Sequence, residues 1–246
     1  MAAALHVHPT TELAERVLLP GDPGRALLLA QALLEQPKMF NHNRGLWGYT
    51  GTATDGAPLT IQSTGMGGPS AAIVIEELVQ LGARRFVRVG TCGALVGGFA
   101  LGDVIVAREA VSTDGASRAL GASERVTANS ELTAALEAAA KRELGHRPAS
   151  GAVITTDLFY DPDGKHADPG SDLDPELGPA WAGGPILAIE METATLFRLA
   201  ELRGVRAGCV LAVSDLLGPA HGRIDAEAME AAAQRIGRIG AAALAA

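Results

Sequence analysis

Two acidic residues interrupt an otherwise apolar stretch, Ile186-Leu-Ala-Ile-Glu-Met-Glu-Thr-Ala-Thr-Leu-Phe197. No Lys or Arg lies within five residues of Glu190 or Glu192 on either side. An unpaired carboxylate in a protein core is costly enough that its pKa shifts and its charge is lost, so carboxylates in such a place need partners. The partners of Glu190 and Glu192 must come from elsewhere in the fold or from a ligand.

Two glycine-rich turns are candidates for anion binding. Gly21-Asp-Pro-Gly-Arg25 places an arginine at or near a helix start, where backbone N–H groups and a guanidinium suit an anion. An ordinary turn with a solvated arginine would have the same sequence pattern. Ser63-Thr-Gly-Met-Gly-Gly-Pro-Ser70 could hold phosphate or form a dinucleotide-binding turn. The dinucleotide interpretation is poor, because Arg84 and Arg85 stand near the place where a ribose-binding acid belongs.

A third segment, Arg88-Val-Gly-Thr-Cys-Gly-Ala94, alternates like a strand through Gly90. Thr91 to Gly93 then supply a hydroxyl and free N–H groups where the chain turns. Cys92 is either a small apolar filler or a nucleophile, and filler is favoured because no nearby histidine would activate the thiol.

An aromatic ring and an acid follow two further apolar segments. Phe159, in Thr156-Asp-Leu-Phe-Tyr160, is either a core residue or a planar wall for an aromatic ligand. Asp215, in Ala212-Val-Ser-Asp215, either caps the structure that follows or acts as a proton donor. The second role requires a dry pocket that raises the pKa of its carboxyl group.

Composition argues against several classes of protein. A formal net charge of -8 is unfavourable for gripping nucleic-acid backbones, although a pocket with local positive charge would still bind a small anion. The two cysteines, Cys92 and Cys209, have no metal-ligand spacing and fit a reduced interior. The start, Met-Ala-Ala-Ala-Leu-His, lacks signal-peptide features, and no apolar run reaches the length of a membrane span. We expect a cytoplasmic protein without a metal site and without nucleic-acid or membrane partners.

Short β-branched runs alternate with helical patterns along the chain. The predicted strands are Arg16–Pro20, Leu59–Ser63, Arg85–Gly90, Asp103–Ala107, Ala152–Thr156, Ile186–Glu190 and Cys209–Ser214. The predicted helices are Gly24–Glu35, Ser70–Leu81, Glu131–Leu144, Glu192–Leu202 and Ala226–Ala245. This order predicts one α/β domain over residues 1–246, with a central mixed, largely parallel β-sheet flanked by helices and ligands at the carboxyl ends of strands. The proline-rich segment Tyr160–Pro185 is either a lid or a surface insertion.

Taken together, the motifs resemble those of the nucleoside phosphorylase family, in particular the hexameric bacterial purine nucleoside and methylthioadenosine phosphorylases. The resemblance covers nearly the whole chain. It is carried, in the family's order, by Gly21-Asp-Pro-Gly-Arg25, Asn43-Arg-Gly45, Gly65-Met-Gly-Gly-Pro-Ser70, Arg88-Val-Gly-Thr-Cys-Gly-Ala94, Glu190-Met-Glu192 and Val213-Ser-Asp215. It implies reversible phosphorolysis of a purine nucleoside to the free base and ribose 1-phosphate. Orthophosphate is then a co-substrate, and no cofactor is needed.

The resemblance also implies a role for each matching residue. It assigns the sugar hydroxyls to Glu192, with Glu190 near the sugar or the site's arginines and Met191 against the sugar face, so that substrate supplies most of the partners these carboxylates lack. The proton donor to N7 of the leaving purine is Asp215, and Phe159 stacks on the base. The remaining nucleoside-binding positions are Cys92, Gly93 and Ser214. Phosphate is assigned to Gly21, Arg25, Arg88 and Thr91, with Arg44 supplied by a neighbouring subunit.

Family members also place an N-terminal histidine in the neighbour's site, near the sugar 5′ position. His6 is the candidate here and His8 the rival. Shared sites require at least a dimer, and relatives form hexamers as trimers of dimers. This chain departs from the family pattern at Ala228, where relatives often carry an arginine that helps to poise the proton, and Arg223 is a possible substitute.

Four other functions compete with purine phosphorolysis. Methylthioadenosine phosphorylase differs in a 5′ pocket that the sequence does not define. A uridine phosphorylase would carry a Gln-x-Arg motif that is missing after Asp157-Leu-Phe-Tyr160. A nucleosidase would use water and would not need Arg25, Arg44 and Arg88. A nucleoside sensor would bind without turnover.

Overall fold

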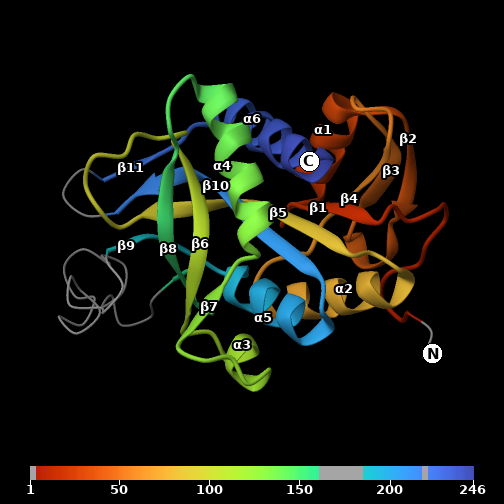
Figure 1. The fold of residues 1–246 in the computed structure, drawn as a ribbon, viewed down its shortest axis with the longest axis horizontal. Coiled ribbons are helices and arrows are strands. Elements are labelled where there is room, and N and C mark those ends of the chain that lie inside the picture. Colours follow the sequence, from red (N-terminus) through yellow and green to blue (C-terminus); the bar gives the residue numbers. More distant parts are fainter. Residues whose placement is uncertain (1–3, 161–184, 218–220) are drawn as a thin grey trace.

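Strands and helices alternate along the chain as predicted, and the computed structural model describes residues 4–160, 185–217 and 221–246 (Figure 1). The helices are α1 (Pro23–Leu33), α2 (Gly68–Leu81), α3 (Gly115–Ala119), α4 (Ser130–Leu144), α5 (Thr193–Arg203) and α6 (Ala226–Ala245), with a 3-10 turn at Asn43–Gly45. The strands are β1 (Arg16–Leu19), β2 (Leu34–Asn41), β3 (Gly48–Ala53), β4 (Pro58–Gln62), β5 (Arg85–Ala94), β6 (Val104–Ser112), β7 (Arg125–Thr127), β8 (Ala149–Thr155), β9 (Ile186–Glu190), β10 (Arg206–Leu216) and β11 (Gly222–Arg223).

All of the predicted strands and helices are present, and the elements that sequence reasoning missed are short or weakly patterned. The hairpin of β2 and β3 is the largest omission. Most of β2 is exposed and contains Pro37, so it has neither an apolar run nor a clean alternation. The proposed lid, Tyr160–Pro185, lies almost entirely outside the described residues, since 161–184 are not described.

The sheet is mixed, as expected, and part of it closes on itself. β5 pairs with β10, β10 with β6, β6 with β8, β8 with β9, and β9 with β5 again. From β5 the sheet also continues outward through β1, β4, β3 and β2. The parallel share is smaller than predicted: β1–β4, β1–β5, β5–β10, β6–β8 and β8–β9 are parallel. The other described pairings are antiparallel: those of the missed strands β2, β3, β7 and β11, and also β6–β10 and β5–β9, which join predicted strands.

Helices cover the sheet in two groups, with α1, α4 and α6 on one side and α2, α3 and α5 on the other (Figure 1). Alternation along β5 divides its side chains between the two cores: Phe86 packs with α2 and α5, whereas Val87 and Val89 pack with α1, α4 and α6. Gly240 in α6 permits close approach, since a Cβ there would lie 2.8 Å from Leu18 Cδ2. None of the described helices combines the length and apolar character that crossing a membrane requires.

An ion pair between the buried Arg16 and the exposed Asp55, at the opposite end of the parallel strands, gives a test of the fold's stability. Arg16, at the start of β1, donates from Nη1 to Asp55 Oδ2 at 2.5 Å and from Nη2 to Asp55 Oδ1 at 2.6 Å. Hydrogen bonding from Arg16 lowers the pKa of Asp55 from 3.8 to about 2. Because the folded pKa is depressed, this stabilisation is present above pH 4 or so and is lost as the pH falls towards 2.

We therefore expect Asp55→Asn to reduce stability at neutral pH and to flatten its decline between about pH 4 and pH 2. The measurement is the urea midpoint as a function of pH for the wild type and the variant. Glu12→Gln, in the neighbouring loop, is the control and should leave the acid limb of the curve unchanged. Parallel curves for the wild type and Asp55→Asn across this range would contradict the assignment.

Candidate active site

Strand register brings the predicted site residues to one edge of the sheet. In the parallel β5–β10 pair, Thr91 lies opposite Ala212, and Gly93 lies opposite Asp215. A bulge between Val213 and Asp215 leaves Ser214 out of the pairing, and bulges of this kind re-aim neighbouring side chains. The Ser214 hydroxyl, which has one proton to donate, lies 3.2 Å from the Cys92 carbonyl oxygen and 2.7 Å from Asp215 Oδ2.

β9 joins the same edge and carries the first of the two glutamates. Ile189 of β9 pairs with Gly93, and Glu190 pairs with Thr155 of β8. Thr91 to Gly93, Glu190 and Asp215 therefore come from three adjacent strands. This confirms that the residues following the apolar runs are brought together at one edge of the sheet.

A buried ion cluster of one arginine and two glutamates lies at this edge. Arg88 Nε donates to Glu190 Oε2 at 3.0 Å, and Arg88 Nη2 lies 2.5 Å from Glu192 Oε2. All three residues are buried. Burial by itself would lower the pKa of Arg88, but the adjacent Glu192 and Glu190 raise it, so the guanidinium stays charged. The arginine is thereby fixed in place as a permanent positive charge.

Glu190 has its hydrogen-bonding capacity filled by the protein. Besides Arg88, its carboxylate accepts from the Thr155 hydroxyl at 2.5 Å, from Glu192 N at 2.9 Å and from Thr193 N at 2.9 Å. An ionised carboxylate offers about four lone-pair positions, and these four donors use them. The expectation that substrate supplies most of the partners is therefore wrong for Glu190. Of the two locations expected for it, the structure supports the one beside the site's arginines.

Glu192 retains free acceptor capacity. Its Oε1 accepts from Gly67 N at 2.5 Å, and its Oε2 is paired with Arg88. Burial raises the pKa of Glu192. The positive charge of Arg88 lowers this pKa and the negative charge of Glu190 raises it, and the net result is a raised pKa. Any additional hydrogen-bond donors, such as a pair of hydroxyl groups, would favour the ionised form of this carboxylate.

A second guanidinium approaches this cluster from α1. Asp22 caps the helix, accepting from Arg25 N at 2.6 Å, and Gly65 N donates to Gly21 O at 3.0 Å. The turn that contains Gly65 continues to Gly67, which binds Glu192, so the two glycine-rich turns meet beside the acid.

Arg25 is placed to attract an anion. Burial lowers its pKa, and the positive charge of Arg88 lowers it further, whereas Asp22 and Glu192 raise it. Within the described parts of the chain, no hydrogen bond or ion pair engages the Arg25 guanidinium. Two neighbouring guanidinium groups, one of them without a partner in the part of the chain that the structure describes, favour a ligand with negative charge.

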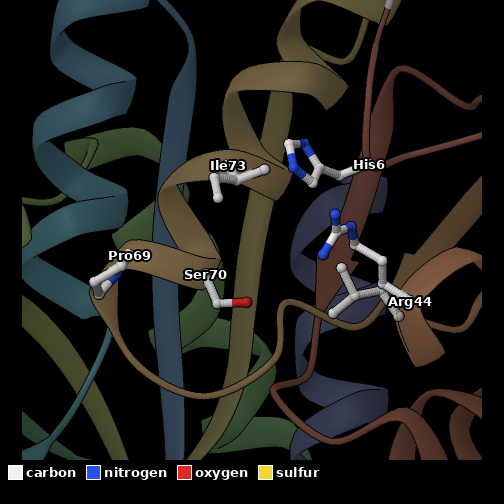
Figure 2. Close-up of a pocket in the computed structure, with 6 residues that line it drawn as sticks. His6, Arg44, Pro69, Ser70 and Ile73 are labelled. Carbon is white, nitrogen blue, oxygen red and sulfur yellow. The ribbon is translucent and has the colours of Figure 1, made fainter.

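His6 and Arg44 line a separate cavity of about 410 Å³, together with Leu46, Pro69, Ser70 and Ile73 (Figure 2). In Figure 2 the His6 imidazole and the Arg44 guanidinium lie close together on one side, with the Ser70 hydroxyl across from them. Neither Arg88 nor Glu192 lines this cavity. His6 and Arg44 thus share a cavity that the ion cluster of their own chain does not line. His8 is exposed and turns back to the Leu5 carbonyl at 3.1 Å.

Asp215 is half-buried and faces an arginine from a strand that the sequence did not predict. β11 pairs antiparallel with the end of β10, so that Arg223 lies opposite Asp215. The Arg223 Nε atom is 3.7 Å from Asp215 Oδ1. Ala228, by contrast, lies in the first turn of α6, where its N–H donates to Asp225 at 2.8 Å. The structure therefore places Arg223, rather than position 228, beside the acid.

Two ambiguous residues are resolved by burial. Phe159 is 59% exposed and makes an edge contact with Tyr160, with ring centroids 4.9 Å apart, so the core interpretation is wrong. Cys92 is buried, and burial raises the pKa of its thiol, which supports a filler over a nucleophile. Met191, which stands between the two glutamates in the sequence, is half-buried.

The described residues contain no cluster of His, Cys, Asp and Glu that would hold a metal ion.

Sequence reasoning missed three residues that organise the site. Thr155 and Gly67 each donate to one of the glutamates, and Glu77 of α2 binds the segment that carries His6. Gly67 lies in the recognised glycine-rich turn, and Thr155 lies in a predicted strand, but no local pattern pairs them with residues so distant in sequence. Glu77 sits on the buried face of a helix with an acid at the adjacent position, so only its burial distinguishes it.

The fold and this charge arrangement are suited to holding a small anion beside a buried acid. Residues 15–245 match the model of the phosphorylase superfamily, and the chain belongs to that superfamily. It is 40% identical over 212 residues to the DeoD-type purine nucleoside phosphorylase of Caldanaerobacter subterraneus subsp. tengcongensis, and the aligned region covers 84% of each chain. It is 40% identical to the enzyme of the same name from Geobacillus kaustophilus, over 84% of this chain and 83% of the relative. A uridine phosphorylase from Treponema pallidum is 39% identical over 82% of this chain and 78% of its own.

Proposed function

We propose that this protein is a purine nucleoside phosphorylase, which reversibly converts a purine ribonucleoside or deoxyribonucleoside and orthophosphate into the free base and the sugar 1-phosphate. The observation that carries the proposal is the buried Arg88, held between Glu190 and Glu192, with the Arg25 guanidinium nearby, which has no partner among the described residues. Relatives named as DeoD-type purine nucleoside phosphorylases support the same assignment.

In this proposal the phosphate binds at the meeting point of the two glycine-rich turns. Gly21 and Thr91 supply hydrogen-bond donors, and Arg25 and Arg88 supply charge. Glu190 does not contact substrate but holds Arg88 and caps the start of α5, because its acceptor positions are occupied. The second acid, Glu192, uses its remaining acceptor capacity for the two sugar hydroxyls. A charged acceptor gives strong, directional hydrogen bonds.

The nucleoside lies between this acid and the end of β10. Met191 packs against the sugar face, and the base sits beside Cys92, Gly93 and Ser214, where β5 and β10 run together. Phe159 stacks on the base with its exposed ring. An apolar face that is exposed in the described chain is consistent with a ligand-covered surface.

Catalysis then follows from charge placement. A phosphate oxygen forms a bond to C1′ as the bond from C1′ to the base breaks, and the bonding electron pair leaves with the base. Positive charge develops on the sugar, and the adjacent phosphate anion stabilises it. Asp215 delivers a proton or a hydrogen bond to N7 of the leaving purine. The nearby Arg223 and Ser214 orient this carboxyl group.

The site is completed by a neighbouring copy of the chain. His6 and Arg44 line one cavity that excludes Arg88 and Glu192 of their own chain, so they are placed to serve another subunit. Met66 and Ile73 near this surface are 85% and 42% exposed, as apolar interface residues would be in an isolated chain. We propose a homo-oligomer, a hexamer built as a trimer of dimers, in which residues 1–246 form one domain per subunit. In this proposal the protein is cytoplasmic, and the reaction needs no cofactor.

A substrate panel tests the function. We expect release of free base from inosine, guanosine or adenosine that depends on orthophosphate, and slower turnover of uridine. Methylthioadenosine belongs in the same panel. Preference for uridine over every purine would instead assign the uridine activity named for the Treponema relative. Base release at full rate without phosphate would assign a nucleosidase and contradict the proposal.

A further inference from the structure

A buried carboxylate outside the ion cluster binds the N-terminal segment. Glu77 lies on the inner face of α2 and is 8% exposed. Its Oε1 accepts from Leu5 N at 3.1 Å, and its Oε2 accepts from His6 N at 2.9 Å and Val7 N at 2.7 Å. One carboxylate therefore receives the N–H groups of consecutive residues, which fixes the path of the chain through His6.

The same carboxylate also binds the imidazole. Glu77 Oε1 lies 2.7 Å from His6 Nδ1. Burial alone would raise the pKa of Glu77, but the hydrogen bonds from His6 and the backbone outweigh it and lower the pKa. An ionised carboxylate only accepts hydrogen bonds, so the proton must be on Nδ1. In a neutral ring, this leaves Nε2 as a hydrogen-bond acceptor.

The imidazole held in this way faces the cavity that also contains Arg44 (Figure 2). Its side chain is 27% exposed, so it is accessible to a ligand. Asn43, from the turn that carries Arg44, donates from Nδ2 to the His6 carbonyl at 3.0 Å. The backbone of His6 is thus anchored on both sides, and the position of its ring is defined before any partner arrives.

We propose that Glu77 is a positioning residue for the phosphorylase reaction: by fixing the proton on His6 Nδ1, it makes Nε2 an acceptor for the 5′-hydroxyl group of the nucleoside in the neighbouring subunit's site. This inference rests on the proposed function. It specifies a substrate class, nucleosides with a free 5′-hydroxyl, over those that lack this donor. A fixed tautomer contributes specificity because a site built to bind one hydroxyl group leaves a polar atom unpaired when that group is missing.

Glu77→Gln tests the proposal, with assays under alkaline conditions in which imidazole is neutral. Glutamine keeps the shape but has only one acceptor oxygen. That oxygen retains two backbone donors, His6 N and Val7 N, when it takes the place of Oε2. The NH₂ group then faces His6 Nδ1, so the proton of the ring is displaced to Nε2. We expect kcat/KM for a purine nucleoside to fall about tenfold, mainly through KM, whereas its 5′-deoxy counterpart is turned over at the wild-type rate. In a His6→Ala background, Glu77→Gln should add no further loss of discrimination.

Glu76→Gln is the matched control, because Glu76 is adjacent on α2 but pairs with the exposed Arg203. It should behave as the wild type with both substrates. Equal losses for the two substrates in Glu77→Gln, or a loss that persists in His6→Ala, would show a merely structural role and overturn the proposal. If wild-type protein releases no base in the presence of phosphate, the proposed function itself fails, which is a separate outcome.

A second measurement has its deciding result in the wild-type protein. Nitrogen NMR of the imidazole rings, with the His6 signals assigned by their loss in His6→Ala, reports which ring nitrogen carries the proton. We expect a protonated Nδ1 in the wild type and a protonated Nε2 in Glu77→Gln. A wild-type ring protonated on Nε2 alone would overturn the proposal.

Discussion

Arg88→Gln is expected to lower kcat/KM for phosphorolysis by about 10²–10³-fold, the loss typical for removing one charge-stabilising donor from an active site. Arg88 contributes the fixed charge beside the phosphate and also neutralises Glu190 and Glu192. Removing one member of a buried ion cluster leaves uncompensated charge, so we also expect the free energy of unfolding to fall by about 3–5 kcal/mol. The measurements are steady-state kinetics and urea unfolding.

A second variant separates the two effects. Arg88→Gln combined with Glu192→Gln removes a buried negative charge along with the positive one, so it should recover part of the stability but none of the activity. Arg203→Gln, at an exposed pair on α5, is the control and should change neither property by much. Folded Arg88→Gln protein with activity within a few-fold of the wild type would show that this arginine does not serve the reaction.

Asp215→Asn is the second change with a large expected effect. Loss of the general acid should reduce kcat by about 10²–10⁴-fold with little change in KM, because the carboxyl group acts on the departing base. The Ser214 hydroxyl still has the Cys92 carbonyl to bind, so the fold should be kept. The measurement is single-turnover cleavage of a natural purine nucleoside.

A 7-methylpurine nucleoside is the matched control for this variant. Its base already carries a positive charge and leaves without a proton from the enzyme. The wild type and Asp215→Asn should therefore cleave it at similar rates. An equal loss with both substrates would mean that Asp215 positions the nucleoside, and unchanged turnover of the natural substrate would exclude an acid role.

The central part of the fold was predictable because its strands are apolar on both sides. β5 and β10 are buried over almost their whole length. Strands buried on both faces have nearly continuous apolar sequences, which can be recognised without the structure. The β2–β3 hairpin was not predictable, because most of β2 is exposed and Pro37 interrupts it, which removes any period-2 signal from that strand. Closure of the sheet through β9 was also beyond prediction, since pairing between distant strands depends on tertiary packing.

For the site, strand-end reasoning correctly brought Arg88, Glu190 and Asp215 to one edge. It could not predict which protein groups donate hydrogen bonds to these side chains. Local sequence shows that Glu190 lacks a nearby cation, but only the structure shows its acceptor positions filled by Thr155, Arg88 and the start of α5. The same is true of Arg223, which reaches Asp215 only because a two-residue strand, β11, turns back beside β10.

The most direct test of the account is the fate of the phosphate, because the two guanidinium groups beside Glu192 are explained here by a phosphate nucleophile. Phosphorus NMR of a reaction with a purine nucleoside and orthophosphate should show the inorganic signal replaced, mole for mole with released base, by that of a sugar 1-phosphate ester. Release of base and free sugar while orthophosphate stays unchanged would contradict it.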